Sequence, residues 1–217
     1  MRINKFIAQQ TSLSRRAADT AISEGRVLIN SEPVGPGSIV SLDDEVKLDG
    51  KLISNTKKTL VTLMLNKPAG YVCSRNGQGS KTIYGLLPNR FRHLNSVGRL
   101  DKNSSGLLLL TNDGNLANKL THPSFQKEKI YEVKLDRKLS DEDIAKVQKG
   151  IRLEDGLSKL QINELGSNKY EVRMSEGRNR QIRRTFEALN SNVKSLHRTK
   201  FGDYALKALP PKSYIEG

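Results

Sequence analysis

Apolar positions near the start of the chain recur at the three- and four-residue spacing of helices. Ile3, Phe6 and Ile7 have this spacing and predict a first helix. Ser14 is a suitable N-cap for a second helix, and Gly25 suits the position just after its last turn. The apolar stripe of this second helix consists of Ala17, Ala18, Ala21 and Ile22.

Short extended segments are predicted after these two helices, separated by residues typical of turns. The predicted extended segments are 26–30, 34, 39–42 and 45–48, and the predicted turns are 31–32, 43–44 and 49–50. Together with the helices they predict a small domain at residues 1–50. The polar, lysine-rich stretch that follows, residues 51–59, predicts a linker.

From residue 60 onward the hydrophobic pattern is typical of strands. Compact apolar runs and alternation with a period of two predict strands at 60–65, 107–110, 131–135 and 170–174. Helical patterns are fewer and lie at 115–120, 140–149 and 178–190. We therefore predict the α+β fold class, with a mainly antiparallel mixed sheet in a second domain at 60–217.

The net charge is concentrated in two segments. The chain has 37 Lys and Arg against 23 Asp and Glu, a formal charge of +14. Residues 67–102 hold seven cations and one anion, and residues 176–200 hold seven cations and two anions. Solvated charged faces are the alternative, but nearly acid-free segments favour a surface that binds nucleic acid. With 5% aromatic residues and no Trp, a stacking platform is not expected to dominate binding.

Several classes of protein are not expected from this composition. No apolar run approaches the roughly 18 residues of a membrane span, and the start of the chain lacks the apolar segment of a signal peptide. We expect a cytoplasmic monomer that does not bind a membrane. Cys73 and three scattered histidines predict neither a disulfide framework nor a metal site.

Asp101 is the first candidate for chemistry. It lies between Arg99 and Lys102 in a polar loop that precedes the apolar run 107–110. Neighbouring cations favour the ionised form of a carboxyl group, which can act as a nucleophile or a base. A carboxylate that only forms a turn is the structural alternative on local grounds.

Five motifs in order along the chain resemble those of pseudouridine synthases. Gly-Arg-Leu-Asp at 98–101 with Ser-Gly-Leu-Leu at 105–108 resembles the catalytic motif of that family. The other motifs that resemble the family lie at 66–70, 129–133, 176–184 and 196–202. They are similar to the RsuA-like branch, which acts on ribosomal RNA. Residues 1–50, above all 14–19 and 25–30, resemble the RNA-binding module named after small-subunit ribosomal protein S-four.

This resemblance implies isomerisation of a uridine to pseudouridine in ribosomal RNA or a pre-ribosomal particle. Residues 116–124, 154–156 and 177–181 are more similar to the enzymes of the large subunit (23S) than to those of the small subunit (16S). A small-subunit enzyme, a non-catalytic ribosome-assembly protein and a base glycosidase remain alternatives. Because isomerisation conserves every atom, no cofactor is expected, and the sequence has no phosphate-binding glycine motif.

By resemblance, Asp101 is the catalytic aspartate, Arg183 is its basic partner, and Tyr131 packs on the uracil ring and is a candidate for proton transfer. Simple sheet packing for Tyr131 and phosphate binding for Arg183 are the alternatives. Thirteen polar residues are further candidates for positioning RNA, because phosphate contacts set register. They are Arg2, Lys5, Arg15, Arg16, Arg26, Lys67, Arg99, Arg178, Asn179, Arg180, Gln181, Arg184 and Arg198.

Overall fold

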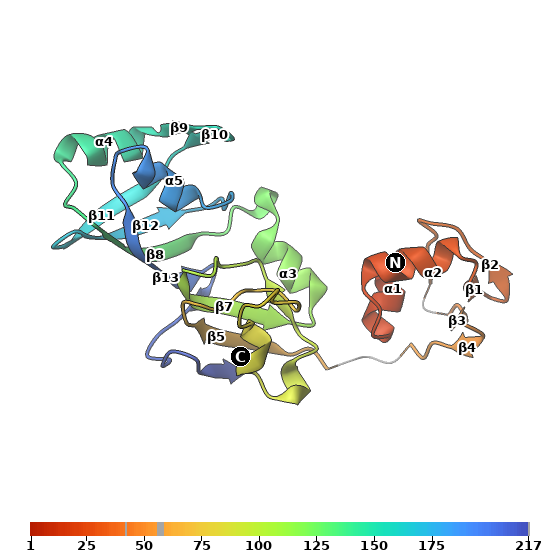
Figure 1. Ribbon diagram of the computed structural model, residues 1–217. Coiled ribbons are helices and arrows are strands. Elements are labelled where there is room, and N and C mark those ends of the chain that lie inside the picture. Colours follow the sequence, from red (N-terminus) through yellow and green to blue (C-terminus); the bar gives the residue numbers. More distant parts are fainter. Residues whose placement is uncertain (42, 56–58, 217) are drawn as a thin grey trace. The chain divides into compact units, whose positions relative to one another are not determined.

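The computed structural model describes residues 1–41, 43–55 and 59–216. These residues belong to two compact units, Met1–Thr59 and Leu60–Gly217 (Figure 1). Each unit has its own buried apolar cluster. Because each cluster is drawn from one unit alone, the units are described separately.

Two helices and a small antiparallel sheet form the first unit. Its elements are α1 (Ile3–Gln10), α2 (Arg15–Ser23), β1 (Val27–Ile29), β2 (Glu32–Pro33), β3 (Val46–Leu48) and β4 (Lys51–Leu52), with strand order β2-β1-β3-β4. Ser14 caps α2 as predicted, since its Oγ accepts a hydrogen bond from the amide of Ala17 at 3.1 Å. Gly25, with a φ of 72°, follows the helix in the left-handed conformation that glycine favours. Both predicted helices are therefore confirmed.

The strands of this unit differ in detail from the prediction. The first hairpin turns at Asn30 and Ser31, both with positive φ, so the turn lies one residue earlier than predicted. In the segment predicted as extended at 39–42, Ile39 forms only an isolated bridge to Arg2, and residue 42 lies outside the described residues. The predicted extended residue 34 is not in a strand.

The predicted linker also begins later than residue 51. A turn at Asp49 and Gly50, both with positive φ, folds the chain back so that β4 pairs with β3. Ile53 then packs on the apolar cluster of the first unit. Residues 56–58 of the predicted linker lie outside the described residues.

A mixed sheet of nine strands forms most of the second unit. The strand order is β11-β12-β8-β13-β7-β5-β15, with β14 paired to β13 and β6 paired to β7. The strands are β5 (Thr62–Lys67), β6 (Asn95–Val97), β7 (Ser105–Thr111), β8 (Lys129–Leu135), β11 (Gln161–Gly166), β12 (Lys169–Met174), β13 (Val193–Phe201), β14 (Tyr204–Ala205) and β15 (Tyr214–Glu216). Only β7 and β13 pair in parallel among these described strands, which confirms the predicted mainly antiparallel sheet.

Helices and a separate hairpin accompany the sheet. The helices are α3 (Gly114–Thr121), α4 (Asp141–Lys149), α5 (Gln181–Glu187) and the short 3-10 helices η1 (Ile83–Leu86), η2 (Asn89–Phe91) and η3 (Pro123–Phe125). The strands β9 (Ile151–Leu153) and β10 (Gly156–Ser158) form the hairpin. In Figure 1, β8 and β13 run between two groups of elements, one with α4, α5 and β9–β12 and the other with β5, β7 and α3.

The last predicted helix is much shorter than expected. The prediction covered residues 178–190, whereas α5 spans only Gln181–Glu187. Arg180 has a φ of 47° and precedes the helix in the left-handed conformation, which cannot continue a right-handed helix. The segment 176–180 is therefore a loop at the start of α5.

Strand β7 is buried on both faces, which explains its uninterrupted apolar run. Leu108 and Leu110 belong to the main cluster of the second unit, whereas Leu107 and Leu109 pack in a second cluster with Leu120 of α3. The strand begins beside β13 at Gly106, where φ is 102°. A Cβ atom there would lie 2.3 Å from the carbonyl oxygen of Arg198. Glycine at this position permits the close approach of the two backbones.

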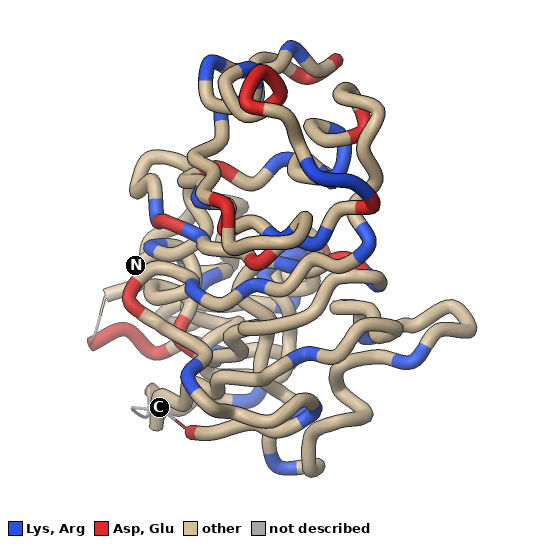
Figure 2. The backbone as a smooth tube through the Cα atoms, turned by 90° about the vertical axis from the view of Figure 1, so that its left-hand side faces the viewer, with Lys and Arg blue, Asp and Glu red and all other residues tan. Residues whose placement is uncertain are grey.

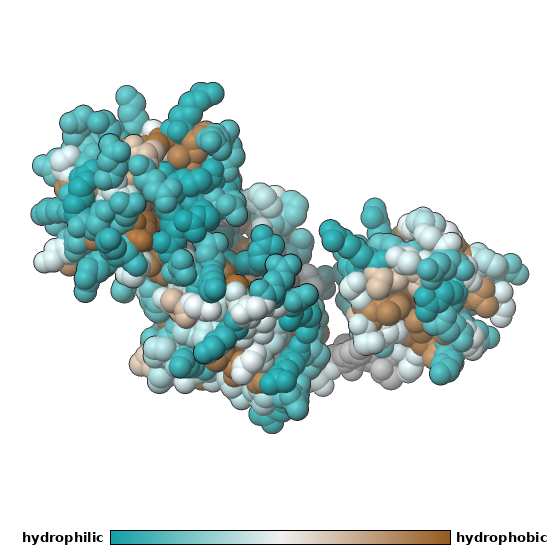
Figure 3. Space-filling model, in the orientation of Figure 1, coloured by the Kyte–Doolittle hydropathy of each residue, from teal (hydrophilic) through white to brown (hydrophobic). Residues whose placement is uncertain are grey.

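Polar side chains dominate the one face of the protein that Figure 3 shows. Lys and Arg are distributed along the backbone of Figure 2, and the face shown in Figure 3 is hydrophilic apart from small apolar patches. Among the described residues, no helix has the length and apolar character that a membrane crossing requires.

Candidate active site

A cavity of about 1330 Å³ lies in the second unit and contains the three residues predicted to be catalytic. Asp101, Tyr131 and Arg183 all line it. Its walls come from the loop at 98–101, from residues 120–131 and from the segment 173–183, with β13 contributing Arg198. This cavity, hereafter the cleft, exceeds the roughly 300–1,000 Å³ of a small-molecule pocket. It has room for a nucleotide together with flanking backbone.

Asp101 begins a tight turn immediately before β7. Its backbone carbonyl accepts hydrogen bonds from the amide of Ser104 at 3.0 Å and from Nζ of Lys67 at 3.1 Å. The side chain is half-buried, and its carboxylate makes no hydrogen bond or ion pair with any described residue. The backbone of this residue is therefore fixed while its carboxylate stays available to a ligand in the cleft.

Lys67 lies beneath this turn and is fully buried. Its ammonium group donates to the carbonyl oxygens of Pro68 at 3.0 Å, Asp101 at 3.1 Å and Ser104 at 2.6 Å. Burial lowers the pKa of Lys67, partly offset by Asp101. The prediction that Lys67 positions RNA is wrong, because all three donors of the ammonium are used inside the protein.

The rest of the turn is held in the same way. The carbonyl oxygen of Lys102 accepts from the amide of Gly70 at 2.7 Å, and that of Asn103 accepts from Nη2 of Arg183 at 2.9 Å. Every carbonyl from residue 101 to residue 104 thus receives a donor. The turn is preorganised by its neighbours, which fixes the carboxylate that it carries.

Arg183 supports this turn from α5 and is almost fully buried. Its guanidinium donates to the carbonyl oxygens of Asn103 and of Val193, the latter at 3.1 Å, and to Oγ of Ser104 at 3.4 Å. Burial lowers the pKa of Arg183, and nearby Arg180 adds to this effect. No ion pair joins Arg183 to Asp101 within the described residues. Arg183 therefore acts on the backbone of the turn at 101–104, hereafter the Asp101 turn, in this structure.

Tyr131 forms part of the cleft wall. It lies on β8, opposite Val172 of β12 and Arg198 of β13, and is 7% exposed. Its ring belongs to the main apolar cluster and also lines the cleft. The sheet-packing role and a position suited to contact a bound base are therefore combined in one residue.

The RNA-positioning candidates around the cleft fall into different environments. Arg99, Asn179 and Arg180 are exposed and line the cleft, as an RNA contact requires. Gln181 is buried, and its amide group binds Ser158 and Glu176, so it is not available to read a base edge.

Arg198 also differs from the prediction. It is 2% exposed, its Nε donates to the carbonyl oxygen of Leu107 at 2.8 Å, and its guanidinium lies 4.7 Å from the ring centroid of Phe201. Its Nη2 is buried without a partner among the described residues. Arg198 therefore joins β13 to β7 and does not reach an external phosphate.

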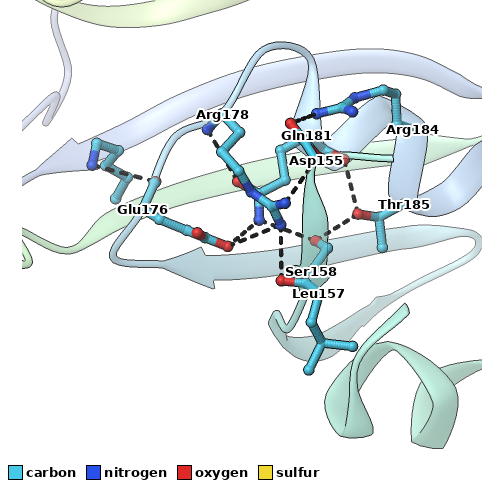
Figure 4. A network of polar contacts seen from close by, with 9 residues as sticks. Asp155, Leu157, Ser158, Glu176, Arg178, Gln181, Arg184 and Thr185 are labelled. Carbon is cyan, nitrogen blue, oxygen red and sulfur yellow. Dashed lines mark hydrogen bonds and ion pairs between the residues drawn. The ribbon is translucent and has the colours of Figure 1, made fainter. Parts of the chain in front are cut away.

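Arg178 and Arg184 are engaged with a carboxylate of the protein. Nη1 of Arg178 and Nη2 of Arg184 contact the two oxygens of Asp155 at 2.8 and 2.6 Å (Figure 4). Their side chains are 20% and 25% exposed. The sequence predicted that these arginines bind phosphates, because their acidic partner, Asp155, lies far from them along the chain.

The candidates in the first unit lie on or beside its helices. Arg2, Arg15 and Arg16 are exposed, and Lys5 is half-buried. Arg26 is exposed but makes ion pairs with Asp49 at 2.6 Å and Glu24 at 2.9 Å. The exposed Arg2, Arg15 and Arg16 and the half-buried Lys5 are therefore accessible to RNA. Arg26 already has anionic partners.

Lys129 is a cleft residue that sequence reasoning missed. It lines the cleft, and its Nζ donates to the carbonyl oxygens of Lys127, Ser175 and Glu176 at 3.2 to 3.4 Å. Burial lowers its pKa. The signal was the period of two in β8, which places residue 129 on the same face as Tyr131.

His197 provides a pH-dependent test of the packing between β13 and the start of β7, next to the turn at 101–104. Its Nδ1 lies 2.9 Å from Oγ of Ser105, and burial lowers its pKa from the ordinary value of 6.5, with Glu132 opposing. The unfolded chain then takes up a proton at higher pH than the folded chain, so stability declines as the pH falls through 6.5. We expect the free energy of unfolding to fall between about pH 7.5 and about pH 5.5 by more in the unmodified protein than in His197→Gln. Chemical denaturation at the two pH values measures this difference, and an equal loss in both proteins would contradict it.

Comparison with known proteins matches both units to established families. Residues 61–188 match the RNA pseudouridylate synthase family, and residues 1–46 match the S4 domain. Ribosomal large subunit pseudouridine synthase B of Yersinia pestis is 36% identical over 99% of this chain, which covers 72% of that protein. The protein of the same name from Haemophilus influenzae is 37% identical over 99% of this chain, which covers 64% of it.

A solved structure agrees with these sequence matches. A crystal structure of a pseudouridylate synthase has 35% sequence identity to this chain and a TM-score of 0.72, and the match covers 100% of this chain and 95% of that one. Both the fold and the order of the domains are therefore shared. The chain belongs to the RNA pseudouridylate synthase family and carries an S4 domain before its synthase domain.

Proposed function

We propose that this protein converts a specific uridine of ribosomal RNA, in the large subunit, to pseudouridine, with Asp101 as the catalytic residue. The observation that carries the proposal is the environment of Asp101. Its carboxylate at the cleft has no hydrogen-bond or ion-pair partner in the described part of the chain, whereas every backbone carbonyl of its turn is held by a donor. If Asp101 served only to form the turn, its neighbours would not need to hold the backbone carbonyls of residues 101–104 and leave the carboxylate accessible from the cleft.

The reaction needs only groups that this site and its substrate supply. The glycosidic bond between N1 of uracil and C1′ of ribose breaks, the base turns within the cleft, and a bond forms between C5 and C1′. The proton lost from C5 is balanced by the proton gained at N1, so no atom enters or leaves. Attack on the sugar, attack on the base and removal of a sugar proton all require an ionised carboxylate beside the ribose, which is the role of Asp101.

The other cleft residues hold the nucleotide and the turn. Tyr131 offers its ring to the uracil base, and Arg183 keeps the Asp101 turn in place through Asn103. Arg99 and Arg180 are exposed at the cleft, and we assign phosphate contacts to them. The target base has to leave its stack to reach Asp101, at a cost of about a few kcal/mol that is smallest in loops and distorted helices.

The domain boundaries follow the same proposal. The first unit, including β4 and Ile53 beyond the predicted boundary at residue 50, forms the S4-like RNA-binding domain, with Arg2, Lys5, Arg15 and Arg16 toward the RNA. Residues 60–217 form the synthase domain. The protein acts as a cytoplasmic monomer on ribosomal RNA or a pre-ribosomal particle. The S4 match and the names of the relatives support this assignment of substrate.

Incubation with unmodified large-subunit and small-subunit ribosomal RNA tests the function. We expect one uridine of the large-subunit RNA to become an isomer of unchanged mass and altered reverse-phase mobility, without any added cofactor. If only the small-subunit RNA were modified, the substrate would be small-subunit and not large-subunit ribosomal RNA. Release of free uracil would instead establish a glycosidase, and RNA binding without either product would establish a non-catalytic RNA-binding protein.

A further inference from the structure

Asp155 joins the β9–β10 hairpin to the segment that leads into α5. One carboxylate oxygen contacts Nη1 of Arg178 at 2.8 Å, and the other contacts Nη2 of Arg184 at 2.6 Å (Figure 4). Arg178 also donates to the carbonyl oxygen of Leu157 at 2.9 Å. Gly156 lies close enough that a Cβ atom there would be 3.2 Å from Nη1 of Arg178. The carboxylate of Asp155 therefore contacts two guanidinium groups, that of Arg178 in the loop before α5 and that of Arg184 in α5.

A polar cluster continues this connection into the protein. Gln181 donates to Oγ of Ser158 at 3.0 Å, and that hydroxyl lies 2.8 Å from Oγ1 of Thr185 (Figure 4). The side-chain oxygen of Gln181 accepts from the amide of Arg178 at 3.1 Å. These contacts fasten the loop at 176–180 and the start of α5 to the hairpin. Two residues past Gln181, Arg183 reaches from α5 to the Asp101 turn.

Carboxylates of the protein pair with both arginines. Asp155 contacts both, Glu176 lies 3.4 Å from Nη2 of Arg178, and the side chains of Arg178 and Arg184 are 20% and 25% exposed. Nε of Arg178 and Nε of Arg184 are buried and lack partners within the described residues. Hydrogen bonding to Arg184 lowers the pKa of Asp155, and the same contact raises the pKa of Arg184. Arg178 and Arg180 both line the cleft, but they differ in exposure and pairing. The side chain of Arg178 is 20% exposed and contacts Asp155 at 2.8 Å, whereas that of Arg180 is 45% exposed and lies 4.0 Å from Glu187.

We propose that Asp155 is a positioning residue that withholds Arg178 and Arg184 from RNA phosphates and uses both to hold α5 and the 176–180 loop at the cleft. The proposal rests on the proposed function, because it concerns RNA bound at that cleft. It divides the arginine-rich segment into two roles. Arg180 contacts RNA, whereas Arg178 and Arg184 keep Arg183 in place behind the Asp101 turn.

The salt dependence of RNA binding distinguishes these roles. Each phosphate neutralised by a protein cation contributes about 0.7 to 0.9 to the slope of log affinity against log salt. We expect Arg178→Gln and Arg184→Gln to retain the slope of the unmodified protein, and Arg180→Gln to reduce it by about 1. Binding of a large-subunit ribosomal RNA fragment at several salt concentrations gives these slopes. A reduced slope in both Arg178→Gln and Arg184→Gln would overturn the proposal.

Removing the carboxylate gives the complementary test. Asp155→Asn removes the carboxylate that the two arginines share and leaves Arg178 with Glu176 and the carbonyl oxygen of Leu157. We expect a steeper slope together with a single-turnover rate about 10- to 100-fold lower, since α5 is less well held. Glu154→Gln is the matched control: it removes the same charge one residue away, and its carboxylate has no hydrogen bond or ion pair with a described residue. A protein merely destabilised by Asp155→Asn would melt at lower temperature without a steeper slope.

The outcomes separate this proposal from the proposed function. If the slopes of Asp155→Asn and Glu154→Gln are the same, or if Asp155→Asn reacts at the rate of Glu154→Gln, the role assigned to Asp155 is wrong. If Asp155→Asn does not fold, the slopes of the three arginine variants decide the question alone. Isomerisation of the same fragment by the unmodified protein tests the proposed function independently of every slope.

Discussion

Asp101→Asn is expected to lower the rate of uridine isomerisation by about four orders of magnitude or more, with little change in RNA affinity. The substitution removes the charge of the carboxylate and keeps its shape. Because the clamp on this turn acts on backbone carbonyls, the substitution leaves the contacts of Lys67 and Arg183 unchanged. Single-turnover kinetics on a large-subunit ribosomal RNA fragment, together with a binding titration on the same fragment, measures both effects.

A matched neutralisation separates catalysis from charge. Asp141→Asn also removes one carboxylate, from the exposed first turn of α4, where it lines no part of the cleft. We expect this control to isomerise uridine at the rate of the unmodified protein. An Asp101→Asn protein as active as Asp141→Asn would exclude Asp101 from the chemistry.

Lys67→Met is expected to reduce the single-turnover rate by about 100-fold, the cost of a catalytic group misplaced by about 1 Å. Methionine fills much of the buried space but donates no hydrogen bond, so the carbonyl oxygens of Pro68, Asp101 and Ser104 lose a shared donor. The turn then no longer fixes the carboxylate. The salt slope of RNA binding stays unchanged, because the ammonium is buried and contacts no phosphate.

Lys102→Met is the control for that experiment. Lys102 belongs to the same turn and is exposed, and Oγ of Ser80, at 3.1 Å, is the only partner of its ammonium among the residues that the structure describes. We expect its rate to stay within a few-fold of the unmodified protein, since its backbone carbonyl is still held by Gly70. If Lys67→Met reacted as fast as Lys102→Met, or if it had a reduced salt slope, the buried ammonium would not be the support of the turn.

The elements with strong local signals were predictable from sequence. The helix that follows Ser14 and the helix that follows Ser140 both have side-chain caps, the latter a complete capping box with Asp143. The apolar run 107–110 became the doubly buried strand β7. In each case the residues that define the element lie within a few positions of one another, so periodicity and capping are sufficient.

The elements that depend on distant partners were not predictable in this way. Strands of two or three residues, such as β4 and β14, exist because they pair with β3 and β13. The parallel pairing of β7 with β13 joins Gly106 to Arg198, and nothing in either segment alone specifies the partner. The start of α5 at Gln181, later than predicted, likewise follows from the left-handed backbone conformation of Arg180, which side-chain spacing does not reveal.

The candidate site shows the same division. Asp101, Tyr131 and Arg183 were brought to one cleft, but the prediction that every nearby cation contacts RNA was wrong for Lys67 and Arg198. A signal for Lys67 was present, because residues 63, 65 and 67 share one face of a strand with a period of two, and the first two are leucines. A charged residue in register with buried leucines indicates an internal hydrogen-bonding role.

The nucleosides recovered from the bound complex decide whether Asp101 is the catalytic residue. Complexes of the unmodified protein and of Asp101→Asn with the same uridine-containing ribosomal RNA fragment are isolated, and the nucleosides of the bound RNA are then separated. We expect pseudouridine in the complex of the unmodified protein and only uridine in that of Asp101→Asn, recovered in similar amounts. Pseudouridine at the target position in the Asp101→Asn complex would exclude Asp101 from the chemistry.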